Sequence, residues 1–184
     1  MDLKTKPDVP DYGRFRATLH WALALAIIAM MVLGFLVMLP MAESDPAKVP
    51  VVRAHMIIGL TIAAMLLFSI PLAYLRRGPP ALTSGRPGLD RLASVTHHAL
   101  RLTCVVIVVS GIATSAIAGV PDVVFGGMAD RLPAGLQNFT AFRVHVLAAS
   151  LLLLLVSLHV AGALFHALVR RDGIFRRMSV FRRA

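Results

Sequence analysis

The chain has 184 residues, of which 58% are hydrophobic and only 15% are charged. Soluble globular domains are roughly half apolar and about one quarter charged, so this composition indicates an integral membrane protein. The formal net charge is +10, but the basic residues follow the pattern of membrane loops described below, and a nucleic acid partner is not needed to explain them. Cys104 is the only cysteine, which excludes an intramolecular disulfide.

The first apolar segment runs from residue 17 to residue 42 without a charge and follows a basic N-terminal stretch. A secretory signal peptide also begins with basic residues, but its apolar region is only about 7–15 residues long. We therefore expect a membrane-spanning helix over about 14–39, beginning soon after Gly13 and ending near Pro40.

Three further uncharged segments follow, at 54–75, 102–121 and 144–169. Each is long enough to cross a bilayer, which takes roughly 20 residues. Together with their flanks they predict helices over about 53–75, 92–118 and 142–169. We find no internal repeat, so the fold predicted for residues 1–184 is a single all-α domain, an integral membrane four-helix bundle in contact with lipid.

The basic residues indicate the orientation of this bundle. Cytoplasmic loops are enriched in Lys and Arg. Fifteen of the nineteen basic residues lie in the N-terminal tail, the loop between the second and third helices, or the C-terminal tail; the other four are Lys48, Arg53, Arg131 and Arg143. We expect both termini to be cytoplasmic and the protein to lie in a bacterial inner membrane.

All the histidines lie within or beside the predicted helices: His20, His55, His97, His98, His145, His159 and His166. Ionisable side chains in a membrane are costly and usually functional. The spans contain no Asp or Glu, which argues against a proton-coupled or histidine-lined metal transporter, kept here as a distant alternative. Neutral imidazole is a good axial ligand for haem iron.

His145 and His159 are fourteen residues apart, which on a helix is about 40° short of four turns and a rise of about 21 Å. They therefore share a face at opposite depths in the membrane, as two haems placed one near each surface require. His55 lies two residues inside Arg53, and His145 lies two residues inside Arg143. This depth pairs His55 with His145 at the periplasmic side.

On the cytoplasmic side, depth alone allows His20 to pair with either His159 or His166. His166 is about 31 Å from His145 along the helix, too far for rapid electron tunnelling between the two sites. We therefore predict that His20 and His159 form the second pair, and that His166 contacts a haem propionate or a quinone. His97 and His98 have no further partner and are expected at the interface, with a quinone or propionate contact as the alternative.

These residues resemble the bacterial cytochrome b561 family. The resemblance covers nearly the whole chain and includes Leu19-His20-Trp21, His55 with Gly59, the segment from His159 to His166, and the tail that begins Arg171-Asp172-Gly173. It implies two non-covalent b haems whose iron is bound by the four paired histidines. It also implies electron transfer with ubiquinone, and in one branch of the family the oxidation of superoxide at the outer face.

We therefore expect a superoxide:ubiquinone oxidoreductase. The alternative is a cytochrome b subunit without catalysis of its own that exchanges electrons with a periplasmic redox protein. Arg53 and Arg143 are expected to hold propionates or attract an anion, or else to reach lipid headgroups. Many family members carry an arginine where this chain has Ser69, and we hypothesise that Arg101 takes its place beside a propionate or quinone.

Overall fold

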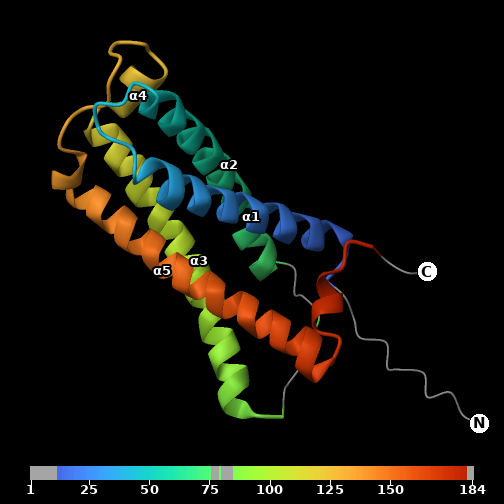
Figure 1. The fold of residues 1–184 in the computed structure, drawn as a ribbon. Helices are drawn as coiled ribbons and strands as arrows, with labels where there is room; N and C mark the ends of the chain where they lie inside the picture. Colours follow the sequence, from blue (N-terminus) through green and yellow to red (C-terminus); the bar gives the residue numbers. More distant parts are fainter. Residues whose placement is uncertain (1–11, 76–78, 80–84, 182–184) are drawn as a thin grey trace, which may run out of the picture.

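The computed structural model describes residues 12–75, 79 and 85–181. Within these residues every regular element is helical, and four helices are long and apolar enough to cross a membrane. This confirms the predicted all-α membrane fold. The four long helices are α1 (Arg14–Val32), α2 (Lys48–Leu75), α3 (Pro87–Ile117) and α5 (Thr140–Leu164) (Figure 1).

Two of the long helices continue as wider π-helical turns: η1 (Leu33–Met38) extends α1, and η3 (Phe165–Arg170) extends α5. The elements between and after the long helices are short. They are α4 (Val120–Val124), η2 (Leu136–Asn138) and η4 (Phe175–Met178).

Two proline positions explain why helices begin earlier than expected from the sequence. Helix α2 begins at Lys48 rather than near residue 53, and Pro50 lies in its first turn. Helix α3 begins at Pro87 rather than near residue 92. The first four N–H groups of a helix have no partner within it, so proline costs little there. Gly119, with φ of 64°, separates α3 from α4 within the region expected to be a loop.

The long helices pack in two close pairs. The backbone of α3 follows α5 most closely, α1 packs on α2, and α2 contacts α3 (Figure 1). Among the described residues, the backbone of α5 makes few close contacts with α1 and few with α2. The backbone of α5 therefore lies farther from α1 and α2 than from α3, and side chains bridge this distance.

A central apolar core joins three helices through Ile62 and Leu66 of α2, Cys104 of α3 and Leu152 of α5. Many other apolar side chains point outward. Leu67 is 78% exposed and Leu154 is 65% exposed. An apolar exterior of this kind is stable when lipid surrounds it, as expected for a multi-pass membrane protein.

The two ends of the bundle differ. We call one the basic end, formed by residues 12–21, 85–101 and 159–181, and the other the opposite end, formed by residues 39–56 and 118–145. At the basic end the C-terminal segment folds over the start of α1, where the Tyr12 N–H donates to the Arg177 carbonyl and the Trp21 indole donates to the Met178 carbonyl at 2.8 Å. At the opposite end α4 packs on the start of α2 through Val49, Val52, Val120, Val123 and Val124.

Candidate functional site

The structure brings both predicted histidine pairs together. The ring centres of His55 and His145 are 6.0 Å apart at the opposite end, with 70° between the ring planes. The ring centres of His20 and His159 are 6.3 Å apart at the basic end, with 68° between the planes. Each pair links α5 to a helix with which its backbone makes little close contact.

These separations fit two rings that share one metal ion. An imidazole nitrogen lies about 1.1 Å from its ring centre and binds a transition metal at about 2.0 Å, so two axial rings have centres about 6 Å apart. One ring nitrogen of His55 is also buried without a hydrogen-bond partner among the described residues. Buried polar atoms are almost always paired, so the unpaired Nδ1 of His55 is open to a ligand.

The ring of His145 is held by α3. Its Nδ1 lies 2.9 Å from the carbonyl oxygen of Ile107, and the hydroxyl of Ser110 lies 3.4 Å from the same nitrogen. A carbonyl only accepts, so Nδ1 carries the proton and Nε2 is free to bind a metal. Histidine ligands of metals commonly donate their second N–H to a carbonyl in this way.

Gly111 gives this ring its space. A Cβ atom at Gly111 would lie 3.0 Å from Cε1 and 3.1 Å from Nδ1 of His145. Gly111, Ile107 and Ser110 are not among the site residues predicted from the sequence. A glycine within an apolar helix indicates a close contact with a neighbouring helix. That His145 makes this contact depends on the register between α3 and α5.

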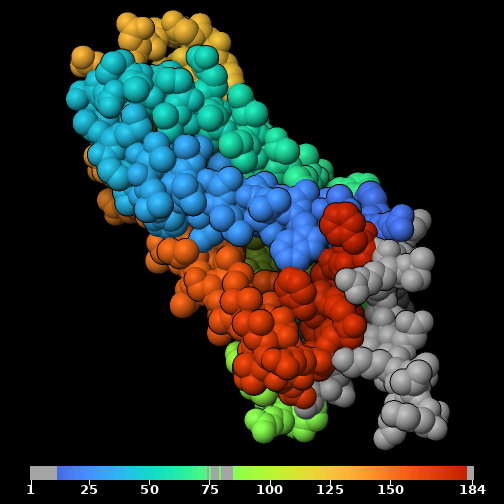
Figure 2. Space-filling view, turned by 45° about the vertical axis from the view of Figure 1, so that its right-hand side comes forward, coloured from blue at the N-terminus to red at the C-terminus, as the bar shows by residue number. Residues whose placement is uncertain are grey.

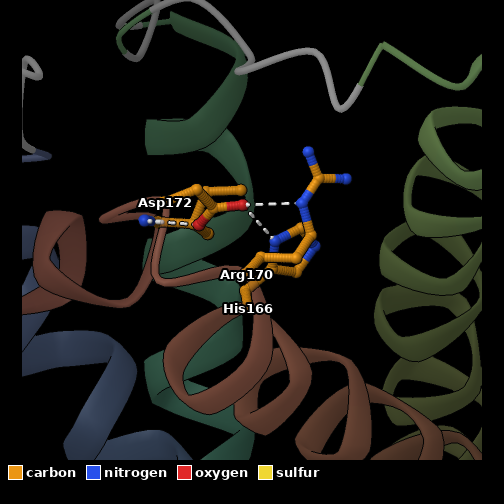
Figure 3. Close-up of polar contacts among 4 residues, drawn as sticks. His166, Arg170 and Asp172 are labelled. Atoms are coloured by element: carbon orange, nitrogen blue, oxygen red, sulfur yellow. Dashed lines mark hydrogen bonds and ion pairs between the residues drawn. The ribbon is translucent and has the colours of Figure 1, made fainter.

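His166 makes a different contact from the one expected. Its Nδ1 donates to Oδ2 of Asp172 at 2.6 Å, and Nε of Arg170 lies 3.4 Å from the same oxygen (Figure 3). Burial raises the pKa of Asp172, but the hydrogen bonds from His166 and the Ile174 N–H, together with the charge of Arg170, outweigh it. The pKa of Asp172 therefore lies below its ordinary value. Whether His166 also contacts a quinone or propionate stays a prediction.

His97 and His98 are adjacent in sequence and differ in their contacts. The ring centre of His97 lies 5.2 Å from that of His159. Both side chains are exposed, and Nδ1 of His98 contacts the carbonyl of Ser94 in its own helix at 2.8 Å. Arg101, also exposed, lies one helical turn after His97.

The arginines beside the opposite-end pair bind backbone carbonyls. Nε of Arg53 donates to the carbonyl of Val124 at 2.6 Å, and Nε of Arg143 donates to the carbonyl of Gln137 at 3.0 Å. Arg53 also lines a surface groove that includes Pro46, Asp130 and Arg131. Their expected contact with propionates or an anion stays a prediction.

An apolar groove lies at the basic end, lined by Trp21 and residues of the C-terminal segment such as Phe175, Met178 and Phe181. Trp21 also packs edge-on against His20, with 5.5 Å between ring centres. Figure 2 shows the surface hollowed between α1 and the C-terminal part of α5, with α3 at the floor. Apolar space therefore lies next to the basic-end histidine pair.

Comparison with known proteins identifies the family of this chain. No curated protein and no solved structure matches the chain significantly. The family model for prokaryotic cytochrome b561 matches residues 11–179, a range that includes all seven histidines. The chain therefore belongs to the prokaryotic cytochrome b561 family of membrane electron-transfer proteins, and this membership implies that it binds haem b.

Proposed function

We propose that this cytochrome binds two b haems, one between His55 and His145 and one between His20 and His159. The observation that supports the proposal is the ring separation of 6.0 Å in one pair and 6.3 Å in the other, at opposite ends of the same bundle. Each haem supplies an iron centre that gains or loses one electron. The chain supplies the ligands and their orientation.

The two sites have different surroundings. At the opposite end, α3 fixes the His145 ring through the Ile107 carbonyl. Between the sites, the apolar core of Ile62, Leu66, Cys104 and Leu152 excludes water. The two ligands on α5 are about 21 Å apart along the helix, so the two sites together span much of the bilayer and give electrons a path across it.

At the basic end we propose that ubiquinone accepts the electrons. Reduction of a quinone to the hydroquinone takes two electrons and two protons, so a proton-carrying group beside the site is needed. His166 meets this need. Its Nδ1 donates to Oδ2 of Asp172 at a distance of 2.6 Å, and its Nε2 is left to exchange protons with a ligand. The apolar groove beside Trp21 suits the tail or ring of such a molecule.

We propose that the protein lies in the inner membrane with both termini in the cytoplasm, so that the opposite end faces the periplasm. Superoxide is the proposed electron donor at that end. Two superoxide ions release two electrons and form two molecules of O₂, which balances one quinone reduced. Arg53 lies two residues from His55 and Arg143 two residues from His145. Their positive charges lie at the depth of the two rings and favour an anion at this end of the bundle.

A second candidate is electron exchange with a periplasmic redox protein. The groove beside Arg53 carries both Asp130 and Arg131. A mixture of charges of both signs gives weak attraction for a small anion but suits a protein partner with complementary charges.

Haem content tests the first part of the proposal. The purified protein is expected to show a low-spin b-type spectrum when reduced with dithionite, and two haems per chain by pyridine haemochrome assay. One haem or none contradicts the two-site scheme. Rapid mixing of the holoprotein with superoxide and a short-chain ubiquinone then separates the two candidates. Rapid haem reduction followed by quinone reduction supports superoxide as donor, and no reduction by superoxide favours the periplasmic protein.

A further inference from the structure

The ring of His97 lies closer to the ring of His159 than the two rings of either proposed ligand pair lie to each other. The ring centres of His97 and His159 are 5.2 Å apart, compared with 6.0 Å and 6.3 Å in the two proposed ligand pairs. Aromatic rings in direct edge-to-face contact have centres about 5 Å apart, and the planes of the His97 and His159 rings meet at 65°. The distance to His97 therefore fits direct contact between the rings, with no metal ion between them.

A similar contact between α3 and α5 is found at the opposite end of the bundle. Helix α3 runs antiparallel to α5, so that Ile107 meets His145 and His97 meets His159. Both α5 histidines thus have a polar group of α3 beside them. At the opposite end this group is the Ile107 carbonyl, and at the basic end it is an imidazole.

We propose that His97 is a positioning residue for the basic-end haem. Its imidazole contacts His159 from α3 and holds the ring in the orientation that faces His20, as the carbonyl of Ile107 does for His145. This inference rests on the two-haem scheme proposed above. In this scheme His97 does not bind iron itself and acts through His159, which does.

The inference predicts effects confined to one haem. Groups that hydrogen-bond or pack against a ligating imidazole set its ring orientation and basicity, and through them the potential of the metal. Loss of the His97 ring is therefore expected to change the low-spin electron paramagnetic resonance signal and the reduction potential of the basic-end haem. The haem bound by His55 and His145 is expected to keep both properties.

The test compares three variants of the full-length holoprotein: His97→Ala, His97→Gln and Val95→Ala. Haem per chain, the largest g value of each ferric signal and the potential of each haem are measured, with the signals assigned from variants that lose one haem. His97→Ala is expected to keep two haems and to alter one signal and one potential. His97→Gln, which retains a polar side chain, is expected to restore them in part. Val95→Ala, at a position of the same helix that is 57% exposed, is the control and is expected to leave all of them unchanged.

Two results would overturn the inference. Unchanged signals and potentials in His97→Ala would show that the contact has no effect, and loss of one haem from His97→Ala but not from His20→Ala would make His97 the ligand. His97→Leu, which retains side-chain bulk, carries the same test if the alanine variant does not fold. A wild-type protein with fewer than two haems would instead contradict the proposed function, so the two failures are distinguishable.

Discussion

The carbonyl oxygen of Ile107 on α3 lies 2.9 Å from Nδ1 of His145 on α5. This contact means that a proposed haem ligand is oriented by a helix that supplies no ligand itself. Among the four long helices, α1 and α2 each contribute one histidine to the pairs and α5 contributes two, while α3 packs most closely on α5. We therefore expect α3 to determine how the two rings of α5 are oriented.

Removal of a ligand should cost one haem and leave the other. We expect His145→Ala and His55→Ala to lose the same haem, and His159→Ala and His20→Ala to lose the other, each falling from two haems per chain to one. The reason is that a single axial ligand leaves the iron with half of its protein bonds. Pyridine haemochrome counts and reduced-minus-oxidised spectra measure this. If His55→Ala and His145→Ala lost different haems, the pairing would be wrong.

Gly111→Ala should disturb the opposite-end site. Its new Cβ would lie 3.0 Å from the His145 ring, and overpacking of this kind costs about 1–3 kcal/mol. The ring must shift, so we expect a changed signal from one haem and a lower thermal unfolding temperature. Gly88→Ala is the matched control in the same helix, because a Cβ there meets no atom within 4 Å. Equal behaviour of the two variants would contradict the close contact at Gly111.

Asp172→Asn should slow quinone reduction without removing a haem. The change removes the carboxylate that accepts from His166 at 2.6 Å, which weakens the hold on its proton. We expect at least a severalfold fall in the rate of ubiquinone reduction, with haem content and reduction by dithionite unchanged. Asp130→Asn, in the groove at the opposite end, is the control. An unchanged rate in Asp172→Asn would exclude a role for this pair in proton transfer.

The contacts of Asp172 should also depend on pH. Its pKa is lower in the folded protein than in the unfolded chain, where it is about 3.9. The ionised carboxylate therefore contributes stability that is fully present above the unfolded pKa and is lost as the pH falls through the folded one. We expect the Ile174 amide, which donates to Asp172, to remain protected at pH 5 and to lose protection only below about pH 3.9.

Hydrogen exchange of the segment around Ile174, corrected for intrinsic rates, measures this change. Asp172→Asn serves as the reference without a titrating group. Loss of protection already at pH 5 to 6 would mean that the carboxylate is not the group responsible.

The sequence by itself determined the class of fold and the proposed pairing of ligands. Four uncharged segments of spanning length require helices, because backbone polar groups in lipid must be paired within the chain. The fourteen-residue spacing of His145 and His159 follows from helix geometry alone. The depths of His20 and His55 relative to neighbouring arginines, together with the distance limit on electron tunnelling, then identified partners whose ring centres lie 6.3 Å and 6.0 Å away in the structure.

Only the tertiary structure decided what surrounds these rings. The contacts of His145 with Ile107 and Gly111, of His159 with His97 and of Arg53 with Val124 all join different elements of the chain. They depend on how far each helix is rotated and shifted along its neighbour. Hydropathy carries little information on that rotation, because lipid is as apolar as the helix interfaces themselves. His166 and Asp172 are close in sequence, but their contact depends on the turn at Arg171, whose φ is 51°.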